Sequence, residues 1–154
     1  MVRKIRNLTK QKIDFKILDE KINLWMKMTK KERKYQLIQK KYAGQHLILE
    51  FYGCQKNLDS TKEIKKILLK AAEKCQVAIL SSKIHHFSPQ GISAVVIIKE
   101  SHLSIHTWPE YNYAAIDLFT CGKVSPEKAI PELKKGFQPK FIQATLIKRG
   151  FLKL

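Results

Sequence analysis

Three short strand patterns follow one another closely in the middle of the chain, and they restrict the possible folds more than any other feature. Residues 91–98 are almost wholly apolar and rich in β-branched side chains, which is typical of a buried strand and too short for a membrane span. Residues 103–108 alternate apolar and polar side chains, and 113–119 form a third strand pattern. The links between them are so short that only antiparallel hairpins can join them. The sequence therefore predicts an antiparallel sheet at the centre of the fold.

The remainder of the chain from residue 44 onward supplies the other elements of one domain, 44–154. Further strand patterns lie at 46–52, 77–82 and 141–148, and a turn is expected at 87–91. With two helices, the predicted order is β-α-β-β-β-β-α-β. Two helices on one face of a mainly antiparallel sheet make a two-layer α/β sandwich of the α+β class.

Both predicted helices carry recognisable boundaries. In 59–74 the apolar residues share one helical face and lysines occupy the other. The apolar face consists of Ile64, Ile67, Leu68, Ala71 and Ala72. Either Asp59 or Ser60 can cap this helix. The second helix is expected to begin at Ser125, whose hydroxyl precedes a proline and an acidic residue, and to end at Gly136.

Residues 1–43 form a basic extension that holds +10 of the net charge of +17. An apolar stripe at helical spacing runs through it, made of Leu18, Ile22, Trp25 and Met26. We predict one or two helices here, packed on the domain or on a partner subunit. A basic amphipathic helix that lies on a membrane or on nucleic acid is the alternative.

The positive charge alone suggests a nucleic-acid or anionic-membrane partner. However, only four of the 30 basic residues are arginines, the residue that base recognition and bidentate phosphate binding favour. A solvated lysine-rich surface is the simpler interpretation, so we expect neither a nucleic-acid nor a membrane partner.

The cysteine pattern indicates a reducing compartment. Cys54, Cys75 and Cys121 are widely spaced and include no Cys-x-x-Cys pair, which argues against a disulfide framework or a cysteine zinc site. The chain contains no 18-residue apolar run and does not begin with a signal-peptide pattern. We therefore expect a cytoplasmic protein.

Residues 99–110 concentrate imidazoles, hydroxyls and carboxylates directly after the buried strand, an arrangement that suits a closely held site. His102 and His106 are four residues apart, the spacing at which a helix presents two zinc ligands. Here Leu103 and Ile105 alternate with the histidines, which instead places both on one face of a strand. Because no third-ligand motif accompanies them, we expect no metal.

A cysteine and a histidine offer a second kind of chemistry, since a thiolate beside an imidazolium is a strong nucleophile. Cys54 and Cys75 are expected to be buried structural residues. Cys121 differs because it ends the strand next to the reactive one and precedes Gly122, where a thiol can face a pocket.

Four ordered blocks carry a family resemblance. They are GQHL with EFY in 44–52, FSPQGIS in 87–93, ESHLSIHTWPEY in 100–111 and AAIDLFTCG in 114–122. In this order and spacing they resemble the signature of the prokaryotic S-adenosylmethionine decarboxylases. The resemblance is close from 44 to 122 and looser toward the C-terminus.

Three positions depart from the family pattern. Asn112 and Ala94 stand where glycine is usual, and Lys99 precedes the pair at which such chains are cleaved. Asparagine tolerates the left-handed conformation that a glycine would adopt, so we expect the turn at Asn112 to be retained. The extension 1–43 has no counterpart in the short members of the family.

The resemblance implies a precursor that cleaves itself between Glu100 and Ser101 into chains 1–100 and 101–154, with Ser101 becoming a pyruvoyl group. The serine hydroxyl attacks the preceding carbonyl to give an ester, elimination gives dehydroalanine, and hydrolysis leaves a ketone and releases ammonia. That ketone is the only cofactor implied: it forms a Schiff base with the substrate amine and accepts electrons as carbon dioxide leaves. The implied enzyme makes the aminopropyl donor of polyamine synthesis and is a homodimer of processed protomers.

The resemblance also implies the roles of individual residues. His106 is a base that helps to resolve the cleavage intermediate, and Ser93 assists proton movement during processing. Cys121 protonates the α-carbon after decarboxylation. Phe87 stacks on adenine and Glu110 accepts hydrogen bonds from the ribose hydroxyls.

Tyr42 is a candidate second wall for the adenine.

Two alternative functions remain open at this point. A free basic amino acid, arginine or ornithine, is decarboxylated by related pyruvoyl enzymes, although Phe87 and Glu110 favour a nucleoside. A basic nucleic-acid-binding module explains the charge but leaves the central motifs unexplained.

Overall fold

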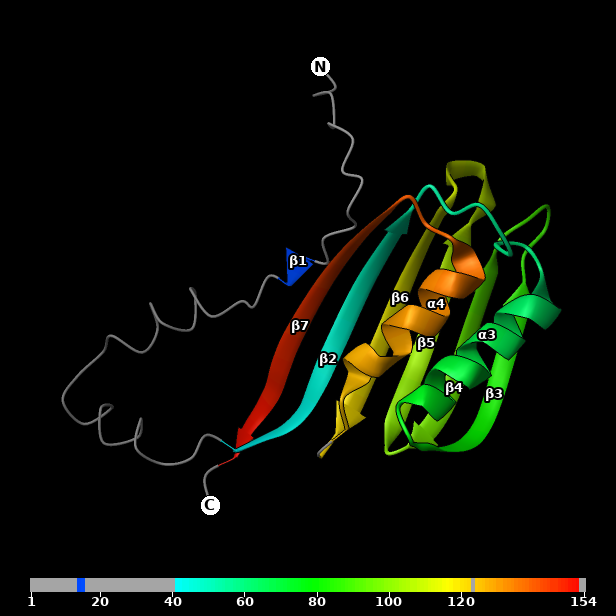
Figure 1. Cartoon of the computed structure of the whole chain (residues 1–154). Helices are drawn as coiled ribbons and strands as arrows, with labels where there is room; N and C mark the ends of the chain where they lie inside the picture. Colours follow the sequence, from blue (N-terminus) through cyan, green and yellow to red (C-terminus); the bar gives the residue numbers. More distant parts are fainter. Residues whose placement is uncertain (1–13, 16–40, 123, 153–154) are drawn as a thin grey trace.

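The computed structural model describes residues 14–15, 41–122 and 124–152 (Figure 1). Its elements, in chain order, are β1 (Asp14–Phe15), β2 (Lys41–Tyr52), α3 (Thr61–Lys74), β3 (Ala78–His86), β4 (Ile92–Lys99), β5 (Ser101–Trp108), the 3-10 turn η1 (Pro109–Tyr111), β6 (Tyr113–Cys121), the 3-10 turn η2 (Pro126–Ala129), α4 (Ile130–Phe137) and β7 (Phe141–Leu152).

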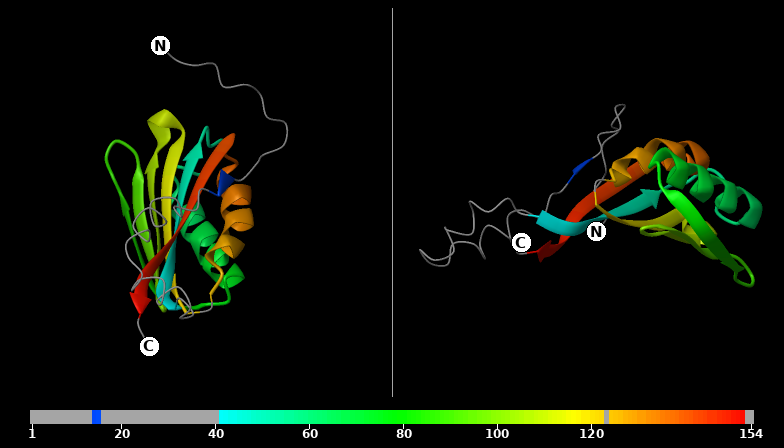
Figure 2. Two further views of the ribbon diagram at one scale, coloured as in Figure 1. Left: turned by 90° about the vertical axis from the view of Figure 1, so that its left-hand side faces the viewer. Right: turned by 90° about the horizontal axis from the view of Figure 1, so that it is seen from below.

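The seven strands form one sheet in the order β1-β7-β2-β6-β5-β4-β3 (Figure 1). The two-residue β1 pairs parallel to β7, and the other neighbouring strands pair antiparallel. The two central hairpins, β4 with β5 and β5 with β6, are those that the short links predict. Helices α3 and α4 lie side by side on one face of the sheet (Figures 1 and 2). The predicted mainly antiparallel sheet with two helices is therefore confirmed.

The hydrophobic core lies between the two helices and the sheet. All five residues of the predicted apolar face of α3 are buried. In β4, β5 and β6 every second residue is buried in turn, and Leu47, Leu49 and Phe51 of β2 are fully inaccessible to solvent. The intervening residues of these strands lie on the opposite side, which no helix of the described residues covers. We call that side the open face, and its members in β4, β5 and β6 are Ser93, Val95, Ile97, His102, Ser104, His106, Trp108, Tyr113, Ala115, Asp117, Phe119 and Cys121.

Helix α3 begins at the predicted cap. The Ser60 hydroxyl accepts a hydrogen bond from the Glu63 N–H at 3.4 Å. That bond satisfies one of the unpaired N–H groups of the first helical turn. Asp59, the other cap candidate, instead contacts Gly91 and His86 with its side chain.

The second helix differs from its prediction at both ends. It is preceded by the separate 3-10 turn η2, and the Ser125 side chain makes no capping hydrogen bond, so the predicted cap is wrong. Helix α4 also continues past Gly136 and ends where Gln138 adopts a left-handed conformation, with φ of 48°. A Cβ atom at Gly136 would lie 2.7 Å from the Ile67 side chain. This glycine therefore allows α4 to pack closely on α3 and does not end the helix.

Five strands, β2, β3, β5, β6 and β7, are longer than predicted, and the extension contains strand residues. β2 begins at Lys41, five residues before the predicted start, and β3 continues to His86. Residues 14–15 and 41–43 belong to β1 and β2, so the helical prediction for 1–43 is wrong at these positions. The remaining residues of that prediction lie outside the described residues.

Candidate active site

Strand β5 carries most of the residues that the sequence singles out, and the fold separates them along its length. Ser101 is the first residue of β5, His106 is the sixth, and Glu110 follows in η1. A strand rises about 3.3 Å per residue, so Ser101 and His106 are separated by about 16 Å. Residues that crowd together in the sequence therefore form two groups in one copy of the protein, at opposite ends of β5.

The first group, which we call the serine end, consists of Ser101, Cys121 and Tyr42. Ser101 pairs with Thr120 across β5 and β6, and Cys121 is the next residue along β6. Cys121 pairs in turn with Gly44 of β2, two residues from Tyr42. The fold thus brings the predicted cleavage point, the predicted proton donor and the predicted second adenine wall to the same end of the central strands.

The backbone at the serine end is strained. Ser101 has a φ of 122°, a conformation that residues with a side chain rarely adopt. Such conformations cost on the order of 1–3 kcal/mol and persist where the surrounding structure enforces them, frequently at functional sites. Here the surrounding structure is a pair of flanking strands, because Ser101 also pairs with Ile98 of β4.

The second group, the histidine end, consists of Phe87, Ser93, His106 and Glu110. Ser93 Oγ lies 2.7 Å from His106 Nδ1, across the pairing of β4 with β5 on the open face. When Nδ1 carries the proton it donates to Ser93, which leaves Nε2 free to accept a proton from another group. The hydroxyl thus orients the imidazole as a base.

The adenine and ribose candidates lie on linked loops. Phe87 is 47% exposed, with its ring edge-on to His85 at 4.6 Å between centroids. Gln90 Nε2 donates to Glu110 Oε2 at 3.2 Å, which connects the loop 87–91 to η1. An exposed aromatic ring and a partly engaged carboxylate therefore stand at the same end of the sheet.

Asp59 fixes this loop from the side of α3, a function that the sequence does not reveal. Its Oδ1 accepts a hydrogen bond from the Gly91 N–H at 2.8 Å and lies 2.8 Å from His86 Nε2. The Gly91 hydrogen bond and, after it, the His86 contact lower the pKa of Asp59. The loop itself closes through the Phe87 N–H, which donates to the Gly91 carbonyl at 2.8 Å.

An aromatic row on the open face is a second feature that sequence reasoning missed. Trp108 and Tyr52 each lie 5.2 Å from Tyr113 between ring centroids, and Phe141 follows at 5.9 Å from Tyr52. Tyr113 donates a hydrogen bond to Glu50, and burial, followed by this contact, raises the pKa of Tyr113. Trp108, Tyr52 and Phe141 are between 38% and 48% exposed, so the row leaves a large apolar surface beside the histidine end.

The three thiols occupy two environments. Cys54 and Cys75 are buried as predicted, and burial raises the pKa of each to about 11. Cys121 is only partly buried and stands on the open face. Within the described part of the chain, no three His, Cys, Asp or Glu side chains gather as a metal site would require.

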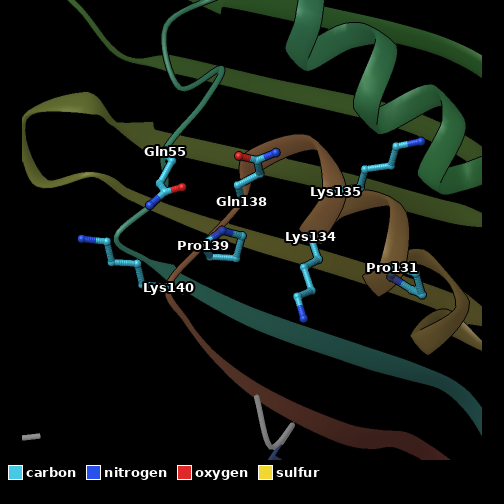
Figure 3. A pocket seen from close by; sticks show the side chains of 7 residues that line it. All are labelled: Gln55, Pro131, Lys134, Lys135, Gln138, Pro139 and Lys140. Atoms are coloured by element: carbon cyan, nitrogen blue, oxygen red, sulfur yellow. The ribbon is translucent and has the colours of Figure 1, made fainter. Parts of the chain in front are cut away.

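The described helices are all too short or too polar to cross a membrane. A hollow of about 650 Å³ lies beside the turn from α4 to β7. Figure 3 shows the side chains that line it, among them Lys134, Gln138 and Lys140. A second hollow of about 370 Å³ contains Asp59 and Pro109. Neither of these two hollows includes a residue of the serine end or of the histidine end.

Comparison with known proteins agrees with the fold and defines the class of protein, an enzyme on a two-layer α+β scaffold. The sequence model described as S-adenosylmethionine decarboxylase matches residues 45–150. The chain is 46% identical over 114 residues to an S-adenosylmethionine decarboxylase proenzyme of Methanococcus maripaludis, covering 73% of this chain and 93% of the relative. It is 49% identical over 112 residues to a protein of the same name from Thermotoga petrophila, covering 71% and 86%.

A solved structure agrees as well. The adenosylmethionine decarboxylase of Aquifex aeolicus superposes with a TM-score of 0.69 at 32% identity, covering 73% of this chain and 95% of that one. The chain belongs to the S-adenosylmethionine decarboxylase family, and the resemblance seen in the sequence motifs is confirmed.

Proposed function

We propose that this protein is a self-processing, pyruvoyl-dependent decarboxylase of S-adenosylmethionine that works in the cytoplasm and makes the aminopropyl donor for spermidine synthesis. The observation that carries the proposal is the strained Ser101, which directly follows Glu100 in the family motif. The name proenzyme, which the relatives bear, supports a precursor that must be processed.

The serine end fits a pyruvoyl group derived from Ser101. The side-chain oxygen of Ser101 forms a bond to the carbonyl carbon of Glu100 as the peptide C–N bond breaks, which gives an ester with a free amine. His106 removes the α-proton of Ser101, and the Cβ–O bond breaks with the Glu100 carboxylate as leaving group. Addition of one water and loss of one ammonia complete the pyruvoyl end of chain 101–154. Ser93 accepts a hydrogen bond from the protonated Nδ1 of His106, so that Nε2 is the nitrogen that takes the proton.

In turnover, the pyruvoyl group supplies a ketone that draws electrons away from the substrate as carbon dioxide leaves. The chain's own residues bind the substrate and move the proton. Cys121 gives a proton to the α-carbon from its partly buried position beside Thr120. Phe87 stacks on adenine and Glu110 accepts hydrogen bonds from the ribose diol, with the second Glu110 oxygen held by Gln90. Tyr42 forms the other wall of the adenine site.

A homodimer brings the two ends together. Proton transfer requires heavy atoms within about 3 Å, whereas His106 lies about 16 Å along β5 from Ser101 in the same copy. A second copy related by a two-fold axis presents its histidine end to the serine end of the first, and the reverse contact follows by symmetry. The exposed aromatic row supports an interface through the open face.

The two alternative functions are less well supported. Decarboxylation of arginine or ornithine requires the same serine chemistry but gives Phe87 and Glu110 no purpose, and the relatives are named for S-adenosylmethionine. A nucleic-acid-binding module gives no account of the Ser93–His106 hydrogen bond or of Ser101.

Release of labelled carbon dioxide distinguishes the substrates. Purified protein is incubated with carboxyl-labelled S-adenosylmethionine, arginine or ornithine, and Ser101→Ala serves as the inactive control. We expect release from S-adenosylmethionine alone. We also expect a loss of about 5- to 150-fold in kcat/KM in Phe87→Ala, because stacking contributes about 1–3 kcal/mol per base. Release from a free amino acid and none from S-adenosylmethionine would favour the first alternative.

A further inference from the structure

Thr120 holds an unusual hydroxyl. The residue is 1% exposed. Among the described residues, Thr120 Oγ1 is the one buried side-chain nitrogen or oxygen atom that has no hydrogen-bond partner. More than nine in ten buried polar groups in folded proteins have a partner, because an unpaired one is costly. A valine would fill the same space without that cost, so the hydroxyl calls for an explanation.

The other buried threonine of the described residues, Thr107, shows what the fold provides when a hydroxyl is structural. Thr107 is 5% exposed and also faces the helices. Its Oγ1 accepts a hydrogen bond from the Ile92 N–H at 2.8 Å and donates to the Ile92 carbonyl at 3.4 Å. Thr120 makes neither kind of bond, although it lies in the interior of the same sheet.

The strand register places Thr120 directly opposite Ser101. The pairing of β5 with β6 sets the two residues side by side, and opposite residues in antiparallel strands have Cβ atoms about 4.5–5.5 Å apart. On its other side Thr120 pairs with Gln45, whose amide donates to the Val124 carbonyl. The free hydroxyl therefore stands next to the strained serine that the proposed processing consumes.

We propose that the Thr120 hydroxyl is a positioning group for self-processing, whose partner is the Ser101 side-chain oxygen as it turns to attack the Glu100 carbonyl. This inference rests on the proposed function. Thr120 Oγ1 accepts a hydrogen bond from the Ser101 hydroxyl and so directs a lone pair of the serine oxygen at the carbonyl carbon. The Ser101 proton passes to the departing amide nitrogen, and Thr120 is unchanged at the end.

The same chemistry makes the effect specific to processing. When the Cβ–O bond of the ester breaks, the side-chain oxygen of Ser101 leaves with the Glu100 carboxylate. The Ser101 hydroxyl that Thr120 binds therefore no longer exists after processing, and its oxygen belongs to the carboxylate that ends chain 1–100. A change at Thr120 should slow the maturation of the precursor and leave the turnover of each matured site unchanged.

The test compares Thr120→Val and Thr120→Ser with the unaltered chain. Cleavage of newly synthesised full-length chain is followed by intact mass, and turnover is divided by the number of processed chains. We expect Thr120→Val to slow cleavage at least about tenfold and Thr120→Ser to restore it to within about threefold, since only the serine retains an acceptor. Turnover per processed chain should remain that of the unaltered protein in both variants.

Stability gives an independent readout in the uncleavable Ser101→Ala background. There, Thr120→Val should raise the melting temperature by about 2–4 °C, because it removes an unpaired buried hydroxyl. The matched control, Thr107→Val, should lower it, because it breaks two hydrogen bonds.

The outcomes separate this inference from the proposed function. Absence of cleavage in the unaltered chain refutes the processing itself. If the unaltered chain is cleaved and Thr120→Val is cleaved equally fast, processing stands and the role of Thr120 is refuted. Three other results would also refute the role of Thr120. These are a failure of Thr120→Ser to restore cleavage, a fall in turnover per processed chain that matches the fall in cleavage, and a lower melting temperature for Thr120→Val.

Discussion

Mixing two inactive variants tests whether each site is built from two copies. Ser101→Ala removes the group that becomes the cofactor, and His106→Ala removes the base that acts on it. Because Ser101 and His106 are separated by about 16 Å along β5, a histidine cannot reach the serine of its own chain. Each variant alone should therefore accumulate no pyruvoyl chain.

The magnitude expected from a mixture follows from the symmetry of a two-fold dimer. When the two variants are co-expressed in equal amounts and assemble at random, about half of the dimers contain one of each. In such a dimer, Ser101 of the His106→Ala chain meets His106 of the Ser101→Ala chain, and the other site lacks both. About half of the His106→Ala chains, and none of the Ser101→Ala chains, should thus mature.

Intact-mass analysis reads the result directly, because tags of different mass distinguish the two chains. Decarboxylase activity should reappear in the mixture at about a quarter of the activity of the unaltered protein, since one site in four is complete. The reasoning is refuted if the mixture remains uncut while the unaltered chain is cleaved, or if His106→Ala alone produces the pyruvoyl chain at the normal rate.

The remaining predictions concern three single residues. Cys121→Ser should leave chain cleavage intact and lower kcat by about 10²–10⁴-fold, as measured by carbon dioxide release from fully processed protein, because a serine is a far weaker proton donor; unchanged kcat would exclude the role. Asp59→Ala should raise KM for S-adenosylmethionine up to about tenfold with little change in kcat, because the loop of Phe87 loses the bonds that Asp59 makes to Gly91 and His86. Asp59→Asn should show a part of this rise in KM. The lowered pKa of Asp59 stabilises the fold at neutral pH, and this contribution is lost as the pH falls below 3.8, the ordinary value; the deficit in melting temperature of Asp59→Asn should therefore be present at pH 7 and vanish in strong acid. Gly136→Ala should destabilise the fold by about 1–3 kcal/mol in denaturant unfolding, because the new Cβ meets Ile67 at 2.7 Å, whereas helix propensity alone predicts a gain of about 1 kcal/mol.

Helices and strands whose apolar residues recur at a regular spacing could be predicted from the sequence. The apolar positions of α3 and the alternation of β4, β5 and β6 agree with the structure because burial on one side imposes the period on the residues. Asn112 also adopts the expected left-handed conformation, with φ of 50°. Gly136 was misread because a glycine required by helix packing looks the same in sequence as one that ends a helix.

The arrangement of the site was less accessible to sequence reasoning. Residues 99–110 look like one cluster, yet a strand extends them over a long distance. Ser101 and His106 are therefore close in sequence and far apart in space. Asp59 and Thr120 carry no local motif. Their significance comes from partners that the sheet brings close, Gly91 for one and Ser101 for the other.

The covalent state of Ser101 tests the central claim most directly. Intact-mass analysis of purified protein should find two chains, 1–100 and 101–154. The second should be lighter, by the mass of one ammonia, than the same peptide with an unmodified amino-terminal serine. Ser101→Ala, purified in parallel, should give a single uncut chain. A single uncut mass for the unaltered protein, in preparations that bind S-adenosylmethionine, would contradict the account.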